Sequence, residues 1–250
     1  MLTQADVHWI ELDSVDSTND YLTRAYQQSR VSGCVAVLAH AQTAGRGRSG
    51  RSWQSAPGAS LCLSLGMPLA GYQLPFLPLC VGVAVAQVLE MLNLPVRLKW
   101  PNDLLIDDQK LGGVLCESFQ TDGGPVTVMG VGLNLLPMNV PDALSGQGAT
   151  SLAASLPEGA TPSALTLAQS IIPSVLNLIN QAQQQGVAAV FNLFTQRDAW
   201  LGREVQVLDQ GEVCYMGKAM GINEHGAYLV NTTGGLRALN AGDLSLRVNA

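Results

Sequence analysis

VRLKWPNDLLIDDQKLGGVLCES, residues 96–118, predicts three strands in a row. VRLKW forms the first strand and must stop at Pro101, because proline lacks the backbone N–H that a sheet ladder needs. LLIDDQKLGGVLCES then predicts a hairpin whose two apolar strands flank a polar turn at 107–109. Two of the chain's three lysines, Lys99 and Lys110, lie in this stretch. It therefore predicts antiparallel pairing in a segment that also holds two of the chain's three lysines.

The remaining sequence extends this sheet and adds helices. Short apolar runs predict buried strands, and longer periodic segments predict helices, one of them with a kink or break near Pro173. From Gly202 onward, short alternating segments separated by turn residues predict a small β-barrel. We expect an α+β fold, with a mixed β-sheet and helices in residues 1–200 and an SH3-like β-barrel domain in 201–250. The segments concerned are strands at 9–12, 34–42, 59–69 and 126–136, and helices at 17–26, 79–92, 163–185 and 187–200.

Composition excludes several classes of protein. The formal net charge of -6 argues against a nucleic-acid footprint over the whole surface. Hydrophobic residues make up 47 % of the chain, enough for a sizeable core. The five cysteines are widely spaced and form no CxxC pair, so we expect free thiols in the cytoplasm and no protein metal site.

Targeting to a membrane is not expected. The N-terminal residues contain acidic side chains and no apolar run, unlike a signal peptide. The apolar stretch 74–94 has the length of a membrane span, but Gln87, Glu90 and Asn93 interrupt it at helical spacing. It therefore predicts a buried helix.

AGRGRSGRSW, residues 44–53, combines three arginines with three glycines. Ordering ten loop residues costs roughly 10–20 kcal/mol of backbone entropy, and only Trp53 offers much apolar area in return. Arginine forks match phosphate and carboxylate oxygens, so the stretch predicts an anion clamp that forms around a ligand. The alternative is a solvated surface loop. The spacing fits neither a P-loop nor, convincingly, a dinucleotide-binding fold.

Three further positions are open to two interpretations each. Asn102 and Asp103 either cap a turn or face a ligand. Lys110 lies next to two glycines that let a ligand approach. It either directs its charge at that ligand or is an ordinary lysine of a hairpin turn. Asn134 follows two glycines inside a strand. Its amide either forms hydrogen bonds with the edge of a purine base or caps a bulge.

Together these stretches resemble the biotin protein ligases, that is, biotin–[acetyl-CoA-carboxylase] ligases. The motifs occur in the family's order within residues 14–136, and the tail is similar to the family's C-terminal SH3-like barrel. They are DSTN (16–19), QTAGRGRSGRSW (42–53), KWPNDL (99–104), KLGGVLCE (110–117) and GVGLN (130–134).

The resemblance implies a two-step reaction in which biotin and ATP, with Mg²⁺, give biotinyl-5′-AMP, and a lysine of a biotin carboxyl carrier protein then takes the biotin. It implies Lys110 and Arg48 as catalytic residues. It further implies two sets of binding residues. Those for biotin are Ser17, Thr18, Asn19, Gln42, Gly45, Arg46, Arg48, Lys110 and Gly113, and those for the nucleotide are Arg48, Arg51, Trp53, Asn102, Asp103, Lys110 and Asn134.

Partners follow from the same resemblance. Because DSTN begins at residue 16, we expect no winged helix-turn-helix and no DNA binding. A homodimer is compatible with the sequence, which does not fix the oligomeric state. Two alternatives remain: a lipoate or octanoate ligase or transferase of the same fold, and a non-catalytic RNA-binding module built on the Gly/Arg loop.

Overall fold

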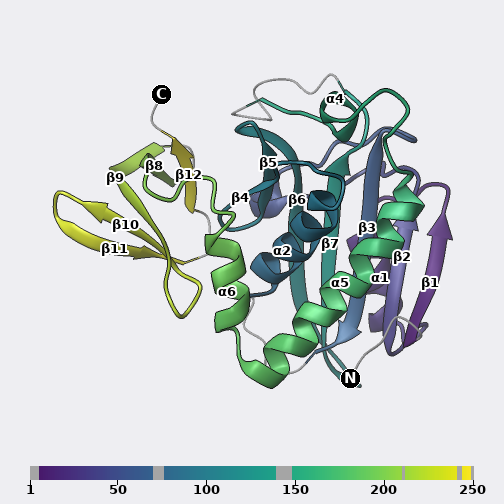
Figure 1. Ribbon diagram of the computed structural model, residues 1–250. Coiled ribbons are helices and arrows are strands. Elements are labelled where there is room, and N and C mark those ends of the chain that lie inside the picture. The colour runs from purple at the N-terminus through teal and green to yellow at the C-terminus, as the bar shows by residue number, and fades with distance from the viewer. Residues whose placement is uncertain (1–5, 70–75, 139–147, 210–211, 241–243, 249–250) are drawn as a thin grey trace.

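A computed structural model describes residues 6–69, 76–138, 148–209, 212–240 and 244–248 (Figure 1). A seven-stranded sheet with the order β1-β2-β3-β7-β6-β5-β4 forms the larger part. β1 and β2 pair in parallel and all other neighbours are antiparallel. Its strands are β1 (Val7–Leu12), β2 (Cys34–Ala39), β3 (Ser60–Pro68), β4 (Arg97–Lys99), β5 (Asp103–Ile106), β6 (Gln109–Thr121) and β7 (Gly124–Asn134). The mixed sheet that the sequence predicted is confirmed.

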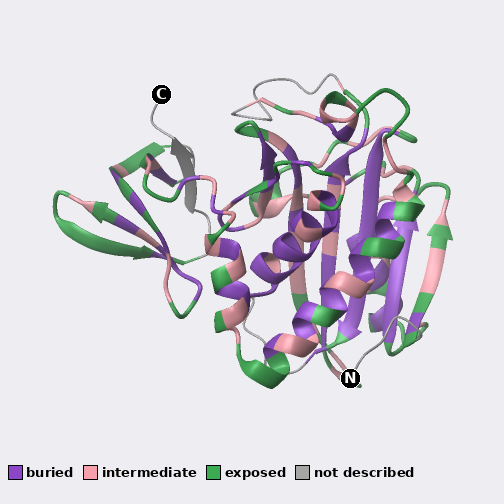
Figure 2. Cartoon of the chain, in the orientation of Figure 1, coloured by how far each residue is buried: buried purple, intermediate pink, exposed green. Residues whose placement is uncertain are grey.

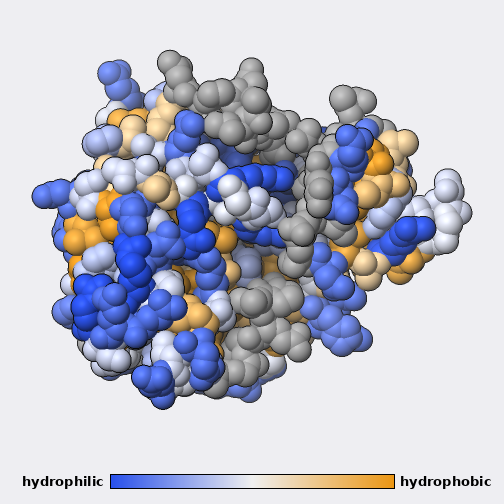
Figure 3. All heavy atoms as spheres, turned by 180° about the vertical axis from the view of Figure 1, so that it is seen from behind, coloured by the Kyte–Doolittle hydropathy of each residue, from blue (hydrophilic) through white to orange (hydrophobic). Residues whose placement is uncertain are grey.

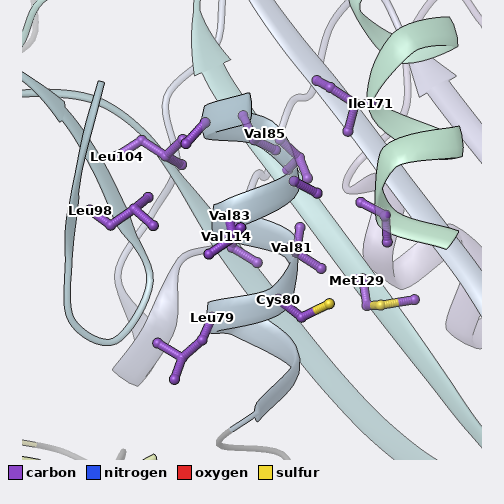
Figure 4. Packing of buried hydrophobic residues seen from close by; sticks show 14 of the residues in the cluster. Leu79, Cys80, Val81, Val83, Val85, Leu98, Leu104, Val114, Met129 and Ile171 are labelled. Carbon is purple, nitrogen blue, oxygen red and sulfur yellow. The ribbon is translucent and has the colours of Figure 1, made fainter. Parts of the chain in front are cut away.

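Two long helices cover one face of this sheet. These are α2 (Phe76–Glu90) and α5 (Ala164–Gln185), followed by α6 (Ala188–Thr195). Alternate residues of β3, including Leu63 and Leu65, pack with α2 and α5 in one large core. Figure 4 shows Val81, Val83 and Val85 of α2 among residues from the strands. We call this the apolar face. The central strands and α2 are buried, whereas β1 is more exposed (Figure 2).

The opposite face, which we call the polar face, carries smaller side chains and α1 (Thr18–Gln27). Ser17 caps α1 by accepting a hydrogen bond from the Asp20 N–H. Leu22 and Tyr26 pack against β2 and β7 in a second, smaller core. The part of this face beyond α1 is lined by polar groups.

Helix α5 continues through Pro173, so of the kink or break that the sequence predicted there, the break is absent. Proline leaves the carbonyl of Gln169 without its helical donor. Gln169 is exposed, where water satisfies such a group. No described helix is long and apolar enough to cross a membrane, and within the 74–94 stretch Phe76–Glu90 form α2 of the core.

The C-terminal part is a five-stranded antiparallel sheet with the order β11-β10-β9-β8-β12. This confirms the all-β C-terminal part that the alternating pattern predicted. Figure 1 shows it beside β4, β5 and the end of α6. The strands are β8 (Glu204–Asp209), β9 (Glu212–Ile222), β10 (Tyr228–Thr232), β11 (Gly235–Leu239) and β12 (Leu244–Val248).

The segment between α6 and β8, which connects the two sheets, pairs with β4 of the seven-stranded sheet. Leu98 of β4 donates its N–H to the Arg197 carbonyl at 2.8 Å and accepts from the Ala199 N–H at 2.9 Å. Asp198 between them is buried and accepts hydrogen bonds from the Tyr228 hydroxyl. Burial raises the pKa of the Asp198 carboxyl, and these hydrogen bonds oppose the rise.

Candidate active site

Four polar side chains meet where α1 begins on the polar face. The Thr18 N–H and hydroxyl both donate to Gln42 Oε1, at 2.8 and 3.0 Å. Ser64 Oγ lies 2.7 Å from Thr18 Oγ1 and 2.6 Å from Asn19 Oδ1. Ser64, Thr18 and Asn19 are buried. Thr18, Asn19, Gln42 and Ser64 therefore form one connected network of donors and acceptors, suited to a flat polar ligand.

The Gly/Arg loop is folded back on itself beside this network. Gly47 N–H donates to the Arg51 carbonyl at 2.7 Å, and Trp53 N–H donates to the Gly45 carbonyl at 2.8 Å. A Cβ on Gly45 would lie 2.5 Å from the Trp53 carbonyl oxygen, so the close approach requires glycine. Arg48–Gly50 form one 3-10 turn in which Ser49 has a φ of 52°. The turn points the arginines of the loop in different directions.

The three arginines have three different surroundings. Arg46 binds two carboxylates, with Nη2 2.6 Å from Asp20 Oδ1 and 2.7 Å from Glu117 Oε2. Arg48 Nη1 donates to Asn102 Oδ1 at 3.1 Å. Arg51 is exposed, and within the described ranges no hydrogen bond or ion pair engages its guanidinium.

Lys110 lies in a group of charges formed by the predicted hairpin. Its Nζ is 2.7 Å from Asp103 Oδ1, while Lys99 Nζ is 3.5 Å from Asp103 Oδ2. Burial raises the pKa of the Asp103 carboxyl, but the two ammonium groups outweigh this effect and hold the pKa below its ordinary value. Asp103 is therefore ionised at neutral pH, and the three charges leave a local excess of one positive charge.

A bulge in the hairpin sets the direction of Lys110. Leu105 pairs with Lys110, but Leu104 pairs with Gly112, so Leu111 is an extra residue. Leu111 is fully buried in the apolar core. As a result Lys110 and Gly113, three positions apart, face the same side, and a Cβ on Gly113 would lie 3.7 Å from Lys110 Cε.

The glycines of GVGLN allow side chains to lie directly on β7. A Cβ on Gly130 would collide with Asn19 Oδ1, and one on Gly132 would lie 2.7 Å from the Trp53 ring. Packing therefore explains both glycines. Trp53 Nε1 is buried and has no hydrogen-bond partner among the described residues, so it remains able to donate to a ligand.

Asn134 supports the lysine through the backbone. Its Nδ2 donates to the Thr150 carbonyl at 2.9 Å, and Thr150 N–H donates to the Lys110 carbonyl at 3.0 Å. The amide nitrogen is thus used inside the protein. The structure brings every candidate residue to the polar face or its rim, with Arg46 drawn toward α1 and away from Lys110.

Sequence reasoning missed several members of this site. Ser64 lies in a strand that alternates large apolar residues with small ones, and that alternation was visible in LCLSLGM (61–67). Asp20 and Glu117 became part of the site only because Arg46 reaches both of them. No local pattern indicates such a pairing, because Glu117 lies 71 positions from Arg46. Figure 3 shows the hydrophilic side chains over this side of the molecule.

Two family descriptions match the chain. Residues 11–134 match the Biotin/lipoate A/B protein ligase family, and residues 200–247 match the Biotin protein ligase C terminal domain. The first match contains every candidate site residue.

Full-length relatives are similar across most of the chain. It is 33% identical over 243 residues to the Bifunctional ligase/repressor BirA of Escherichia coli (strain K12), covering 94% of this chain and 73% of that protein. It is 31% identical over 227 residues to the Biotin--[acetyl-CoA-carboxylase] ligase of Paracoccus denitrificans, covering 86% and 91%.

Solved structures of biotin protein ligases are also similar to the chain. The biotin protein ligase from Aquifex aeolicus in complex with biotin and ATP has a TM-score of 0.83 and 28% identity, covering 97% of this chain and 99% of that one. The biotin protein ligase from Leishmania major in complex with biotin has a TM-score of 0.67 and 27% identity, covering 95% and 99%. The chain belongs to the biotin protein ligase family.

Proposed function

We propose that this protein activates biotin with ATP to give biotinyl-5′-AMP and pyrophosphate, and then transfers biotin to a lysine of a biotin carboxyl carrier protein. One observation carries the proposal. The loop arginine Arg48 reaches Asn102, one residue from the Asp103 carboxylate that pairs with Lys110. A cationic loop and a fixed ammonium group, more than fifty positions apart in the chain, therefore converge on one surface, as a pair of anionic reactants requires.

The network at the start of α1 suits the ureido ring of biotin. A ureido group has one carbonyl acceptor and two N–H donors, and Ser17, Thr18, Asn19 and Gln42 supply hydroxyl, amide and backbone groups of both kinds. We assign these residues to biotin recognition, together with Gly45, which lets the loop approach Trp53 and Gln42, and Gly113, whose lack of a side chain leaves room. Arg46 supports this site by tying the loop to Asp20 and Glu117.

The first step brings two anions together. The biotin carboxylate oxygen attacks the α-phosphorus of ATP, a P–O bond forms, and pyrophosphate leaves with its bonding electrons. We assign to Lys110 the screening of the carboxylate and the α-phosphate, and to Arg48 and Arg51 the binding of phosphate oxygens. Trp53, Asn102, Asp103 and Asn134 are assigned to the nucleotide side of the site.

Magnesium fits this scheme as a companion of ATP. Among the described residues no group of three His, Cys, Asp or Glu side chains could hold a metal ion, and Asp103 is already paired with two lysines. We therefore expect Mg²⁺ to be held mainly by phosphate oxygens, where it neutralises charge on the leaving pyrophosphate. In the second step the amine of the carrier lysine attacks the anhydride carbonyl, and AMP leaves.

We also propose that the chain divides into a catalytic domain, 1–200, and a C-terminal domain, 201–250. The two sheets and the ranges of the two family matches support this division.

Pyrophosphate exchange tests the function directly. The protein is incubated with ATP, Mg²⁺ and labelled pyrophosphate, and exchange into ATP is measured with biotin, with lipoate and with octanoate. We expect exchange with biotin alone, followed by labelling of an isolated carrier domain. Exchange with lipoate or octanoate and none with biotin would replace this proposal by the related acyl ligase activity.

The loop is expected to retain the labile adenylate. Arg48→Gly removes the loop's link to Asn102, so biotinyl-AMP should escape about tenfold faster or more while its formation changes less. Release of free biotinyl-AMP, measured by chromatography without a carrier, checks this. Arg30→Gly, outside the site, is the matched control. Equal release by both variants would remove the retention role from Arg48.

A further inference from the structure

Lys99 is held between Trp200, in the segment that leads into the C-terminal part, and the active-site carboxylate of Asp103. Its Nζ lies 4.8 Å from the centroid of the Trp200 ring and 3.5 Å from Asp103 Oδ2. Its side chain is only 14 % exposed. A cation over an indole face is stabilised by the ring's negative face, and the effect grows when water is excluded. Lys99 is therefore fixed at both contacts.

Trp200 is in turn fixed by buried contacts. Its backbone N–H donates to Asp198 Oδ1 at 3.0 Å, and Asp198 also accepts a hydrogen bond from the Tyr228 hydroxyl at 2.9 Å. The Tyr228 and Trp100 rings are 5.7 Å apart. Trp100 Nε1 donates to the Gly226 carbonyl at 3.1 Å. Both neighbours in KWPND, the lysine and the tryptophan, are thus held by residues at and beyond position 198.

The two oxygens of Asp103 are divided between two lysines. Oδ1 accepts from Lys110 at 2.7 Å, and Oδ2 faces Lys99. When Lys110 turns toward an incoming carboxylate and phosphate, a buried Asp103 with no other cation would lose its charge partner. Lys99 keeps that carboxylate paired and keeps its plane in one orientation, so that Oδ1 continues to face Lys110.

We propose that Lys99, held by Trp200, is a positioning residue that orients Asp103 for Lys110, and that Trp200 and Asp198 link this site to Tyr228 of the C-terminal part. The kinetic test of this inference rests on the proposed function.

The test compares three variants. Lys99→Met removes the charge and keeps much of the volume, and Lys99→Arg keeps a cation over Trp200. Arg203→Met is the matched control, because Arg203 also joins the C-terminal part to the hairpin, through the exposed Asp108, without contacting Asp103. Pyrophosphate release with biotin and ATP gives kcat and KM, and thermal unfolding confirms that each variant is folded.

We expect Lys99→Met to lower kcat about ten- to a hundredfold with little change in KM for biotin. Lys99→Arg should recover most of the loss, and Arg203→Met should resemble the wild type. Equal kcat for Lys99→Met and Arg203→Met would overturn the proposal, as would an arginine variant no better than methionine.

A second measurement needs no catalysis. The charged groups facing Asp103 are Lys99 on β4 and Lys110 on β6, with Arg48 of the loop on the adjacent Asn102. Carbon-detected NMR of the aspartate carboxyls should show the Asp103 pKa raised in Lys99→Met and unchanged in Arg203→Met. An unchanged Asp103 pKa in Lys99→Met overturns the positioning role whatever the activity. A wild-type protein that releases no pyrophosphate with biotin overturns the proposed function alone.

Discussion

The two faces of the seven-stranded sheet use the same strands for different purposes. On β3, Leu61, Leu63 and Leu65 point into the core under α2 and α5. Between them Ser60, Cys62 and Ser64 point to the polar face, and their partners across the ladder on β7 include Gly130 and Gly132. Successive residues of a strand face opposite sides, so β3 contributes a large apolar side chain to one face and then a small one to the other.

This difference separates stability from activity along a single strand. The apolar face excludes water and supplies most of the burial energy. The polar face gives up apolar area, because its glycines and serines leave space for Asn19, Trp53 and a ligand. We therefore expect substitutions on the apolar face to lower the free energy of unfolding, and substitutions on the polar face to impair the reaction in a protein that remains folded.

Lys110→Ala should produce the largest effect on the reaction. Without its ammonium group, biotin and ATP bring unscreened negative charges together, so pyrophosphate release should fall by about a thousandfold or more. The melting temperature should change little. Lys218→Ala, an exposed lysine on β9, is the matched control and should retain full activity. Normal pyrophosphate release from Lys110→Ala would exclude the lysine from the first step.

Leu63→Ala and Ser64→Ala test the comparison at adjacent positions. Leu63 is 1 % exposed in the apolar core, and its truncation should cost about 2–5 kcal/mol of unfolding free energy. Activity per folded molecule should persist. Ser64→Ala removes the hydroxyl between Thr18 and Asn19, and should cost only about 1 kcal/mol. Its KM for biotin should rise about tenfold.

Urea unfolding and initial rates at saturating ATP measure both quantities for this pair. The division between the faces would be wrong if Leu63→Ala raised KM for biotin as much as Ser64→Ala did.

Gly132→Ala should produce a smaller effect of the same kind. The added methyl group would lie 2.7 Å from the Trp53 ring, so the ring must move and KM for biotin or ATP should rise several-fold. Gly82→Ala in α2 is the matched control, because its methyl group meets only Leu98 Cδ2 at 3.6 Å. Steady-state kinetics and thermal unfolding of both variants check the prediction. Unchanged KM values in Gly132→Ala would show that the position of Trp53 does not matter to binding.

Asp16 should show the smallest effect. Its hydrogen bonds to Arg24 lower the carboxyl pKa from 3.8 to about 2. A lowered pKa stabilises the fold above the ordinary value, and this contribution is lost as the pH falls from about 4 to about 2. The pair is exposed, so the contribution should be below about 1 kcal/mol. Asp16→Asn should flatten this part of the stability curve in acid-dependent urea unfolding, and an identical curve would remove Asp16 from the acid response.

Much of the fold was predictable because it depends on local patterns. The alternation in REVQVLD and the turn residues after it predicted the C-terminal strands, and the helix predicted at 17–26 is α1, within one residue at each end. The predicted break in α5 was wrong because Gln169 lies on the exposed side, where a lost backbone hydrogen bond costs little.

The site was predictable as a list of residues and only in part as an arrangement. The motifs predicted that Lys110, Asn102 and Arg48 belong to one site, and the structure places them close together. The ion pairs of Arg46 with Asp20 and Glu117 could not be predicted from the sequence, because these residues come together only in the folded chain. The contact of Lys99 with Trp200 joins residues about a hundred positions apart and has the same origin.

The extra residue at Leu111 has a consequence for insertions and deletions. Substituting Leu111 with another apolar residue would alter only the packing of the core. Deleting it would leave Lys110 and Gly113 two positions apart in a regular ladder, so the lysine would still face the polar side and the core would lose one leucine. At this point one added residue extends the interior by an apolar side chain while the ammonium group keeps its direction, so the strand accommodates a change of length that in a regular ladder would turn every later side chain to the other face.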